Sequence, residues 1–196
     1  MKWAIKNGQR ILATPNNKAE CPLCKKEVIA KCGLIKVWHW AHKSNKDCDN
    51  WYEPETQWHL EWKNKFPKEQ QEVKVGKHRA DIKIKDMVIE LQNSNLSPKE
   101  IIERENYYKN MIWLLNGRKI AKNLELRKKN KSYITFRWKH PPKSWWKAKK
   151  PIYLDFGLGF FMIHVRKIYS NLPCGGWGHL LTREDFLKKI KEMNKK

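Results

Sequence analysis

The sequence contains no long hydrophobic run. Its longest apolar stretch, residues 157–163, is far shorter than the ~20 residues of a membrane-spanning helix, so we expect no membrane helix and no membrane partner. The first residues also lack the apolar run and small-residue cleavage site of a signal peptide. These absences predict a soluble, cytoplasmic protein.

Acidic side chains are scarce, with 20 Asp and Glu against 42 Lys and Arg, so the net charge is +22. Residues 118–196 carry 21 basic and 5 acidic residues, whereas residues 1–117 carry 21 and 15. This asymmetry predicts a polyanionic partner, with nucleic acid favoured over an anionic membrane surface. Eleven tryptophans support nucleic acid, because indole rings stack on unpaired bases; packing in a core is the alternative interpretation.

A chain of 196 residues predicts one main domain with a small addition, at about 150 residues per domain. Hydrophobic residues make up 40% of the sequence, which is sufficient for a folded core. Motifs and charge divide the chain into three predicted parts, residues 1–50, 51–117 and 118–196.

The five cysteines are an odd number, which favours metal binding or free thiols over a disulfide framework. In the first part, an Asn7-Gly8 hairpin precedes six possible zinc ligands: Cys21, Cys24, Cys32, His39, His42 and Cys48. A structural zinc ion needs four ligands. If residues 38–41 form a strand, the two histidines point to opposite faces and only one binds. We therefore predict a Zn2+ site of Cys21, Cys24, Cys48 and one histidine, with His42 favoured over His39. Buried thiols with ordinary polar histidines are the alternative.

The second part opens with a predicted helix of about three turns, bounded by Pro54 and Pro67. Helical spacing gives it one polar stripe and one core-facing stripe. The polar stripe contains Glu55, His59 and Lys63, and the core-facing stripe contains Trp58, Trp62 and Phe66.

Strands are predicted next over residues 73–75, 79–84 and 87–93, the last two with alternating apolar and polar residues. A two-residue turn at Lys85-Asp86 would place Asp81 opposite Glu90. Two facing carboxylates repel each other unless a cation lies between them, and Mg2+ suits such oxygen ligands. The alternative is an exposed hairpin in which Arg79 and Lys83 neutralise the acids.

A capping box, Ser97-Pro98-Lys99-Glu100, predicts a helix that extends to about Lys109. The apolar run at residues 111–115 predicts a buried strand. The order of helix, three strands, helix and strand predicts an α/β fold with a mixed sheet.

These segments resemble the competence protein CoiA-like family. Residues 55–63, 79–81, 89–94 and 103–108 resemble its nuclease domain, whereas Cys21-Pro22-Leu23-Cys24, residues 39–42 and residues 48–52 resemble its zinc-binding N-terminal domain. The resemblance implies a restriction-endonuclease-like, PD-(D/E)XK mixed-sheet core. A small zinc-binding β module would precede this core, and a basic α+β extension would follow it.

By this resemblance, Asp81 and Glu90 hold a catalytic Mg2+ or Mn2+, with Glu55 completing the shell and His59 beside it. The third signature position, usually Lys, is Gln92. An amide cannot take a proton, so Gln92 would orient water or a phosphate oxygen. Lys63 or Lys83 would then supply the missing charge, and the general base stays unassigned.

The third part has strand-like runs over residues 133–138, 151–155 and 160–165, the last two as a hairpin, and a terminal helix over 182–193. Residues 137–150 combine cations with tryptophans, which predicts a nucleic-acid contact; a solvated linker is the alternative. The predicted contact residues are Lys63, Arg79, Lys83, Arg137, Trp145, Trp146, Lys147, Lys149 and Lys150.

Together these features predict a metal-dependent nuclease that hydrolyses phosphodiester bonds in nucleic acid, with DNA favoured over RNA. A non-catalytic nucleic-acid-binding protein that keeps the fold as a scaffold is the second hypothesis. Gln92 and the excess positive charge favour this second hypothesis, whereas the acidic set favours the enzyme.

Overall fold

The computed structural model describes residues 1–44, 48–128, 130, 133–140, 143–157, 161–169 and 174–193. The chain divides into a first unit, residues 1–83, and a second unit, residues 84–196. This division falls inside the predicted second part, and the boundaries expected near residues 50 and 117 stay predictions.

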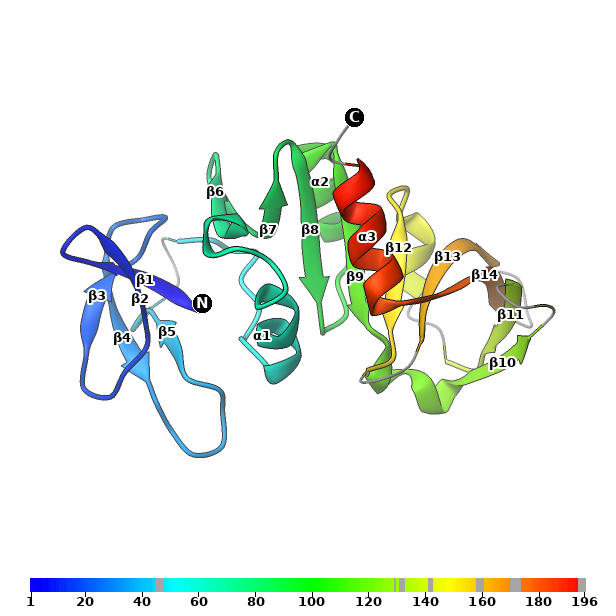
Figure 1. Cartoon of the computed structure of the whole chain (residues 1–196), viewed down its shortest axis with the longest axis horizontal. Helices are drawn as coiled ribbons and strands as arrows, with labels where there is room; N and C mark the ends of the chain where they lie inside the picture. The colour runs from blue at the N-terminus through cyan, green and yellow to red at the C-terminus, as the bar shows by residue number, and fades with distance from the viewer. Residues whose placement is uncertain are drawn as a thin grey trace. The chain divides into compact units, whose positions relative to one another are not determined.

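The first unit begins with a five-stranded antiparallel sheet in the order β2-β1-β3-β4-β5 (Figure 1). The predicted hairpin at Asn7-Gly8 is confirmed, and both residues have positive φ, 50° and 75°, as a tight two-residue turn requires. Trp40 and Val28 are fully buried in the core of this sheet. Its strands are β1 (Trp3–Lys6), β2 (Gln9–Leu12), β3 (Lys18–Glu20), β4 (Glu27–Lys31) and β5 (His39–Ala41).

The helix predicted between Pro54 and Pro67 is shorter than expected. It is α1 (Gln57–Lys63), because Thr56 and His59 form a capping box that starts the helix at residue 57. Glu55 therefore precedes the helix and is not on its polar stripe. The core-facing stripe is confirmed, since Trp58, Trp62 and Phe66 are buried.

An antiparallel hairpin completes the first unit. The short 3-10 helix η1 (Lys68–Gln70) leads into β6 (Gln71–Val75), which pairs with β7 (His78–Ile84). The predicted alternation of β7 is confirmed, with Ala80, Ile82 and Ile84 buried and Asp81 and Lys83 partly exposed.

The second unit contains strands in the order β10-β11-β14-β13-β12-β9-β8. β9 is parallel to β8 and β12, and the other pairs are antiparallel, so the predicted mixed sheet is confirmed. Every residue of β8 is buried, so Glu90 and Gln92 do not lie on an open polar face as expected. The strands are β8 (Met87–Gln92), β9 (Met111–Asn116), β10 (Leu124–Lys128), β11 (Tyr133–Trp138), β12 (Ile152–Asp155), β13 (Phe161–Tyr169) and β14 (Gly175–Thr182).

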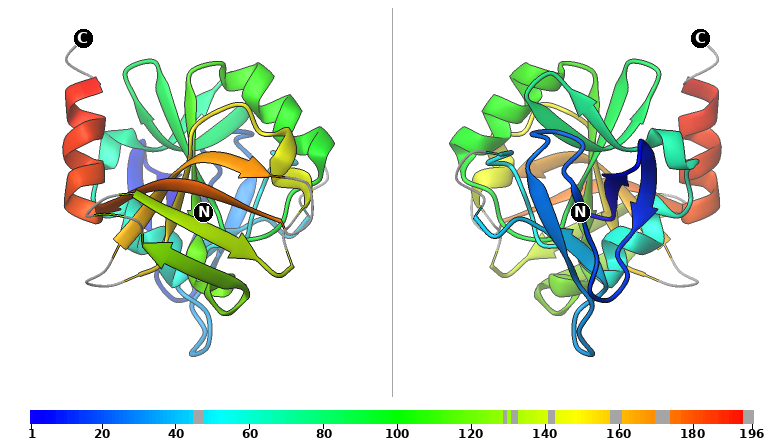
Figure 2. Two further views of the ribbon diagram at one scale, coloured as in Figure 1. Left: turned by 90° about the vertical axis from the view of Figure 1, so that its right-hand side faces the viewer. Right: turned by 90° about the vertical axis from the view of Figure 1, so that its left-hand side faces the viewer.

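Each α-helix of the second unit begins at a capping residue. Ser97 and Glu100 form the capping box of α2 (Pro98–Tyr108), and the Thr182 hydroxyl accepts the backbone N–H of Asp185 at the start of α3 (Arg183–Met193). The ring of Phe186 on α3 packs edge-on against that of Tyr153 on β12. Figure 2 shows the ribbon of α3, in red, from two sides. Three short 3-10 helices are η2 (Gly117–Lys119), η3 (Ala121–Asn123) and η4 (Lys143–Lys147).

The hairpin of β12 and β13 is also confirmed, although residue 160, its predicted second start, lies outside the described residues. β14 was not expected, because three of its first four residues are glycines. A Cβ at Gly176 would lie 2.1 Å from the Lys167 carbonyl oxygen, so the neighbouring strands require glycine there. Within the described part of the chain, no helix is long and apolar enough to span a membrane.

Candidate functional site

Four predicted zinc ligands come together in the first unit. Donor atoms of Cys21, Cys24, His42 and Cys48 all lie within 4.8 Å of one another. The Cys21 and Cys48 sulfurs are 3.8 Å apart, and the Cys24 sulfur is 3.2 Å from His42 Nε2. Two thiolates bound tetrahedrally to one Zn2+ would lie ~3.8 Å apart. The donor set and its spacing therefore fit a metal ion such as zinc.

A tight turn between β3 and β4 presents the first two ligands. The backbone N–H of Cys21 donates to the Lys26 carbonyl (2.9 Å) and that of Lys25 donates back to Cys21 (3.0 Å). The N–H of Leu23 points at the Cys21 sulfur, 3.4 Å away. Burial raises the pKa of Cys48 to about 12, so a metal would have to displace its proton.

Two of the six candidates lie outside this cluster. His39 is absent from the cluster found among the described residues, and its Nδ1 contacts the Val37 carbonyl oxygen at 2.8 Å, two residues back along the chain. Cys32 directly follows β4 and is also absent from the cluster found among the described residues. The preference for His42 is confirmed.

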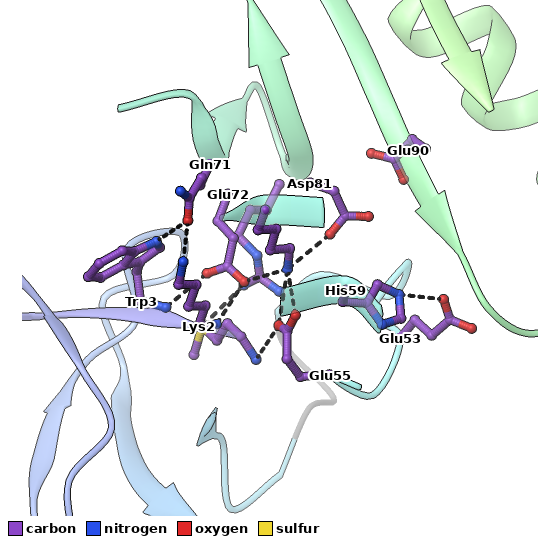
Figure 3. A network of polar contacts seen from close by, with 12 residues as sticks. Lys2, Trp3, Glu53, Glu55, His59, Gln71, Glu72, Asp81 and Glu90 are labelled. Atoms are coloured by element: carbon purple, nitrogen blue, oxygen red, sulfur yellow. Dashed lines mark hydrogen bonds and ion pairs between the residues drawn. The ribbon is translucent and has the colours of Figure 1, made fainter. Parts of the chain in front are cut away.

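Two predicted catalytic residues of the first unit, Glu55 and Asp81, contact the same buried lysine, Lys63. Figure 3 labels both carboxylates. The Lys63 ammonium donates to both Glu55 carboxylate oxygens at 3.0 Å and to Glu72 at 2.8 Å, and lies 3.2 Å from Asp81 Oδ1. Its side chain is 3% exposed, so Lys63 is wrong as a nucleic-acid contact. Burial alone would lower the pKa of Lys63, but the three carboxylates outweigh burial and raise it.

Glu72 is the member of this cluster that the sequence analysis missed. Its carboxylate accepts the backbone N–H groups of Lys2 (2.7 Å), which precedes β1, and of Trp3 (3.0 Å), the first residue of β1. Its φ is 49°, a left-handed conformation that is rare for Glu and costs about 1–3 kcal/mol. Although burial opposes ionisation, Lys63 and Arg79 hold the pKa of Glu72 well below its ordinary value. Glu72 is therefore a charged link between β1 and the Lys63 cluster.

A second link joins the Cys/His cluster to β7. Asp49 directly follows Cys48, and its carboxylate contacts His78 Nδ1 at 2.8 Å and accepts the Arg79 backbone N–H at 2.9 Å. The Arg79 guanidinium lies among carboxylates that raise its pKa against the effect of burial. A nucleic-acid contact of Arg79 stays a prediction.

His59 lies near Glu55 in sequence but has its own partners. Its Nε2 is 3.2 Å from Glu53 Oε2, and its Nδ1 accepts the Thr56 backbone N–H and contacts the Thr56 hydroxyl. These contacts fix the start of α1. A catalytic role for His59 stays a prediction.

The other two predicted catalytic residues lie on β8 of the second unit. Glu90 is buried and accepts from Arg104 Nη1 of α2 at 3.2 Å. The Gln92 amide donates to the Ser94 carbonyl at 3.0 Å. Gln92 also lines a cavity of about 300 Å³ together with Asn93, Ser94, Asn95, Leu115, Asn116, Lys119, Ile120, Trp138 and Trp145. Asp81 and Glu90 belong to different units, so their facing arrangement stays a prediction.

Comparison with known proteins identifies the family. Residues 5–50 match the N-terminal domain of competence protein CoiA, and residues 55–147 match its nuclease-like domain. The chain belongs to the competence protein CoiA family. It is 48% identical over 46 residues to competence protein CoiA of Bacillus subtilis (strain 168), and the match covers 24% of this chain and 12% of that protein. No solved structure matches the chain significantly.

In this member of the CoiA family, one predicted nucleic-acid contact of the basic third lies in the core. Trp145 is 4% exposed and packs edge-on against Trp113 at 5.1 Å, so it is wrong as a base-stacking residue. Trp146 is partly exposed. Arg137 on β11, Lys147 and Lys149 are exposed, whereas Lys150 and Lys83 are partly exposed.

Proposed function

We propose that this CoiA family member is a metal-dependent nuclease of the PD-(D/E)XK type that hydrolyses phosphodiester bonds in DNA. The observation that carries the proposal is Asp81, a partly exposed carboxylate on β7 within a domain that matches a nuclease-like family. Its carboxylate contacts a buried lysine, Lys63, at 3.2 Å. Such charged and partly buried groups are typical of catalytic sites.

Asp81 and Glu90 would hold Mg2+ or Mn2+, since hard divalent ions prefer carboxylate oxygens. When bound, this ion supplies an activated water and offsets charge on the scissile phosphate. Lys63 would position the Asp81 carboxylate, and Arg104 would position Glu90. Gln92 can orient a phosphate oxygen through its amide but cannot take a proton.

Zn2+ at Cys21, Cys24, His42 and Cys48 would have a structural role. Protein side chains supply all four positions, so no site is left for a reacting water. Asp49, next to the ligand Cys48, would hold β7 in place beside the zinc site, because its carboxylate accepts a backbone N–H of the strand that contains Asp81.

A non-catalytic scaffold that binds nucleic acid is the second candidate function. The observation that favours it is that each predicted metal ligand has a protein cation beside it. Asp81 lies 3.2 Å from Lys63, and Glu90 lies 3.2 Å from Arg104. A divalent ion would have to compete with these two charges.

A cleavage assay on labelled single- and double-stranded DNA and RNA decides between the two functions. We expect cleavage with Mg2+ or Mn2+, none with EDTA, and faster cleavage of DNA than of RNA. Binding of these substrates without cleavage under any metal condition would contradict the nuclease and support the scaffold.

A further inference from the structure

The second unit contains a basic cavity. Its volume is about 360 Å³, and four cationic residues line it: Lys149, Lys150, Arg166 and Lys167. All its lining residues are described, and neither Asp nor Glu is among them. A concave site with cations and no lining carboxylate concentrates anionic ligands.

A β-bulge builds one wall of this basic cavity. Val165 of β13 pairs with Gly178, whereas Lys167 pairs with Trp177, so Arg166 is an extra residue in the strand. Regular alternation would send consecutive side chains to opposite faces, and a bulge changes that direction. Five consecutive residues, 164–168, consequently line the same cavity.

Glu105 of α2 fixes the opposite wall. Its buried carboxylate accepts the backbone N–H of Lys149 at 2.9 and 3.0 Å and that of Lys150 at 3.0 Å. It also accepts the indole N–H of Trp113 at 2.9 Å. Because Glu105 binds the backbone here, it holds the Lys149-Lys150 segment in place beside the cavity.

An aromatic side chain, that of Trp146, also lines the cavity. Trp146 is partly exposed, and its buried indole N–H has no hydrogen-bond partner among the described residues. Indole faces stack on bases that are not paired.

We propose that the basic cavity binds single-stranded nucleic acid, with cations on the phosphates and one unpaired base against Trp146. The volume is in the range of small-ligand pockets, ~300–1,000 Å³, which suits one nucleotide and excludes a duplex. This inference rests on the proposed nuclease function, since it assigns the binding site of the substrate. Trp145 lines both this cavity and the one that contains Gln92, so a single indole lies between them.

The experiment measures binding of a fluorescent single-stranded DNA by anisotropy at several salt concentrations. EDTA is present throughout, so binding is measured without metal-dependent cleavage. The double variant Arg166→Ala/Lys167→Ala should bind about 25-fold more weakly near 0.1 M salt, with a salt slope shallower by about 1.4, because each lost phosphate contact removes ~0.7. The matched control Lys188→Ala/Lys191→Ala removes two exposed charges from α3 and should bind like wild type.

Base stacking on Trp146 is tested with two DNA probes, an intact single strand and a strand with abasic sugars. Trp146→Leu should weaken binding of the intact strand about 5- to 150-fold, and Trp146→Phe should restore part of it. A probe with abasic sugars should be insensitive to Trp146→Leu. Unfolding midpoints equal to wild type show that each variant is folded.

Equal losses in the pocket and control double variants, or wild-type binding by Arg166→Ala/Lys167→Ala, would overturn the cavity as the binding site. These results are independent of the proposed function. A wild-type chain that fails to cleave but loses binding in the pocket variants refutes the nuclease and supports the cavity. A wild-type chain that cleaves, together with pocket variants that bind as strongly as wild type, supports the nuclease and refutes the cavity as the binding site.

Discussion

Lys63→Met removes the cation at the centre of the carboxylate cluster and keeps a side chain of similar length. The lysine is 3% exposed and contacts Glu55, Glu72 and Asp81 at 2.8–3.2 Å. The substitution therefore leaves carboxylates buried without their cation. Breaking a buried ion pair from one side costs about 3–5 kcal/mol, which we expect as the loss in free energy of unfolding near neutral pH.

The loss in free energy of unfolding caused by Lys63→Met should depend on pH. The pKa of Glu72 is held well below its ordinary value of 4.5 by Lys63 and Arg79 despite burial. A depressed carboxyl pKa stabilises the fold fully above the ordinary value and loses that effect as pH falls through the folded-state pKa. The difference between wild type and Lys63→Met should therefore be largest near neutral pH and shrink below about pH 4.5.

Urea unfolding at several pH values measures this difference. Lys65→Met is the matched control, because Lys65 is exposed two residues further along the chain, and it should change stability by less than about 0.5 kcal/mol. A Lys63→Met protein as stable as wild type near neutral pH would refute the ion-pair account of the cluster.

Three further predictions concern other parts of the molecule. Cys48→Ser should lower bound zinc from about one ion per chain to a small fraction, whereas Cys32→Ser should retain it; equal zinc content in both, by elemental analysis, would contradict the assigned ligands. Burial lowers the pKa of His164 to about 4, so its protonation favours unfolding and stability falls as pH drops from about 6.5 to 4. Melting temperatures of His164→Phe should fall less steeply across that range, and an unchanged slope would contradict this. Trp145→Ala should cost about 3–5 kcal/mol in urea unfolding, because Trp145 packs in the core, and a loss below 1 kcal/mol would argue for a surface role.

Local sequence signals predicted much of the fold. The Asn7-Gly8 turn requires positive φ at both residues, and the Ser97 capping box closes within four residues. Both features depend only on residues that are neighbours in sequence, so the residue types alone were sufficient to predict them. α1 was predicted too long because the Thr56 capping box, two residues after Pro54, competes with Pro54 as the start signal.

Interactions between distant residues were not predictable in this way. Glu72 receives backbone N–H groups from Lys2 and Trp3, 70 and 69 residues away, so nothing near it in sequence marks it as buried. The sequence around Trp145, rich in lysine, predicts a surface residue, yet Trp145 of η4 packs against Trp113 of β9. The zinc ligands were predicted more fully because metal geometry restricts which residue types and spacings can meet.

The cleavage rate of Asp81→Asn relative to wild type, with saturating Mg2+ on labelled DNA, tests the proposed nuclease most directly. Asn keeps the shape of Asp81, and Lys63 retains its two buried carboxylate partners, so folding should be preserved and is checked by melting temperature. A bound metal ion lowers the activation free energy by several kcal/mol, and each ~1.4 kcal/mol changes the rate tenfold. The cleavage rate should therefore fall about a thousandfold, whereas DNA binding in EDTA should be unchanged. Cleavage by Asp81→Asn at the wild-type rate would contradict the proposed metal site and assign the activity elsewhere.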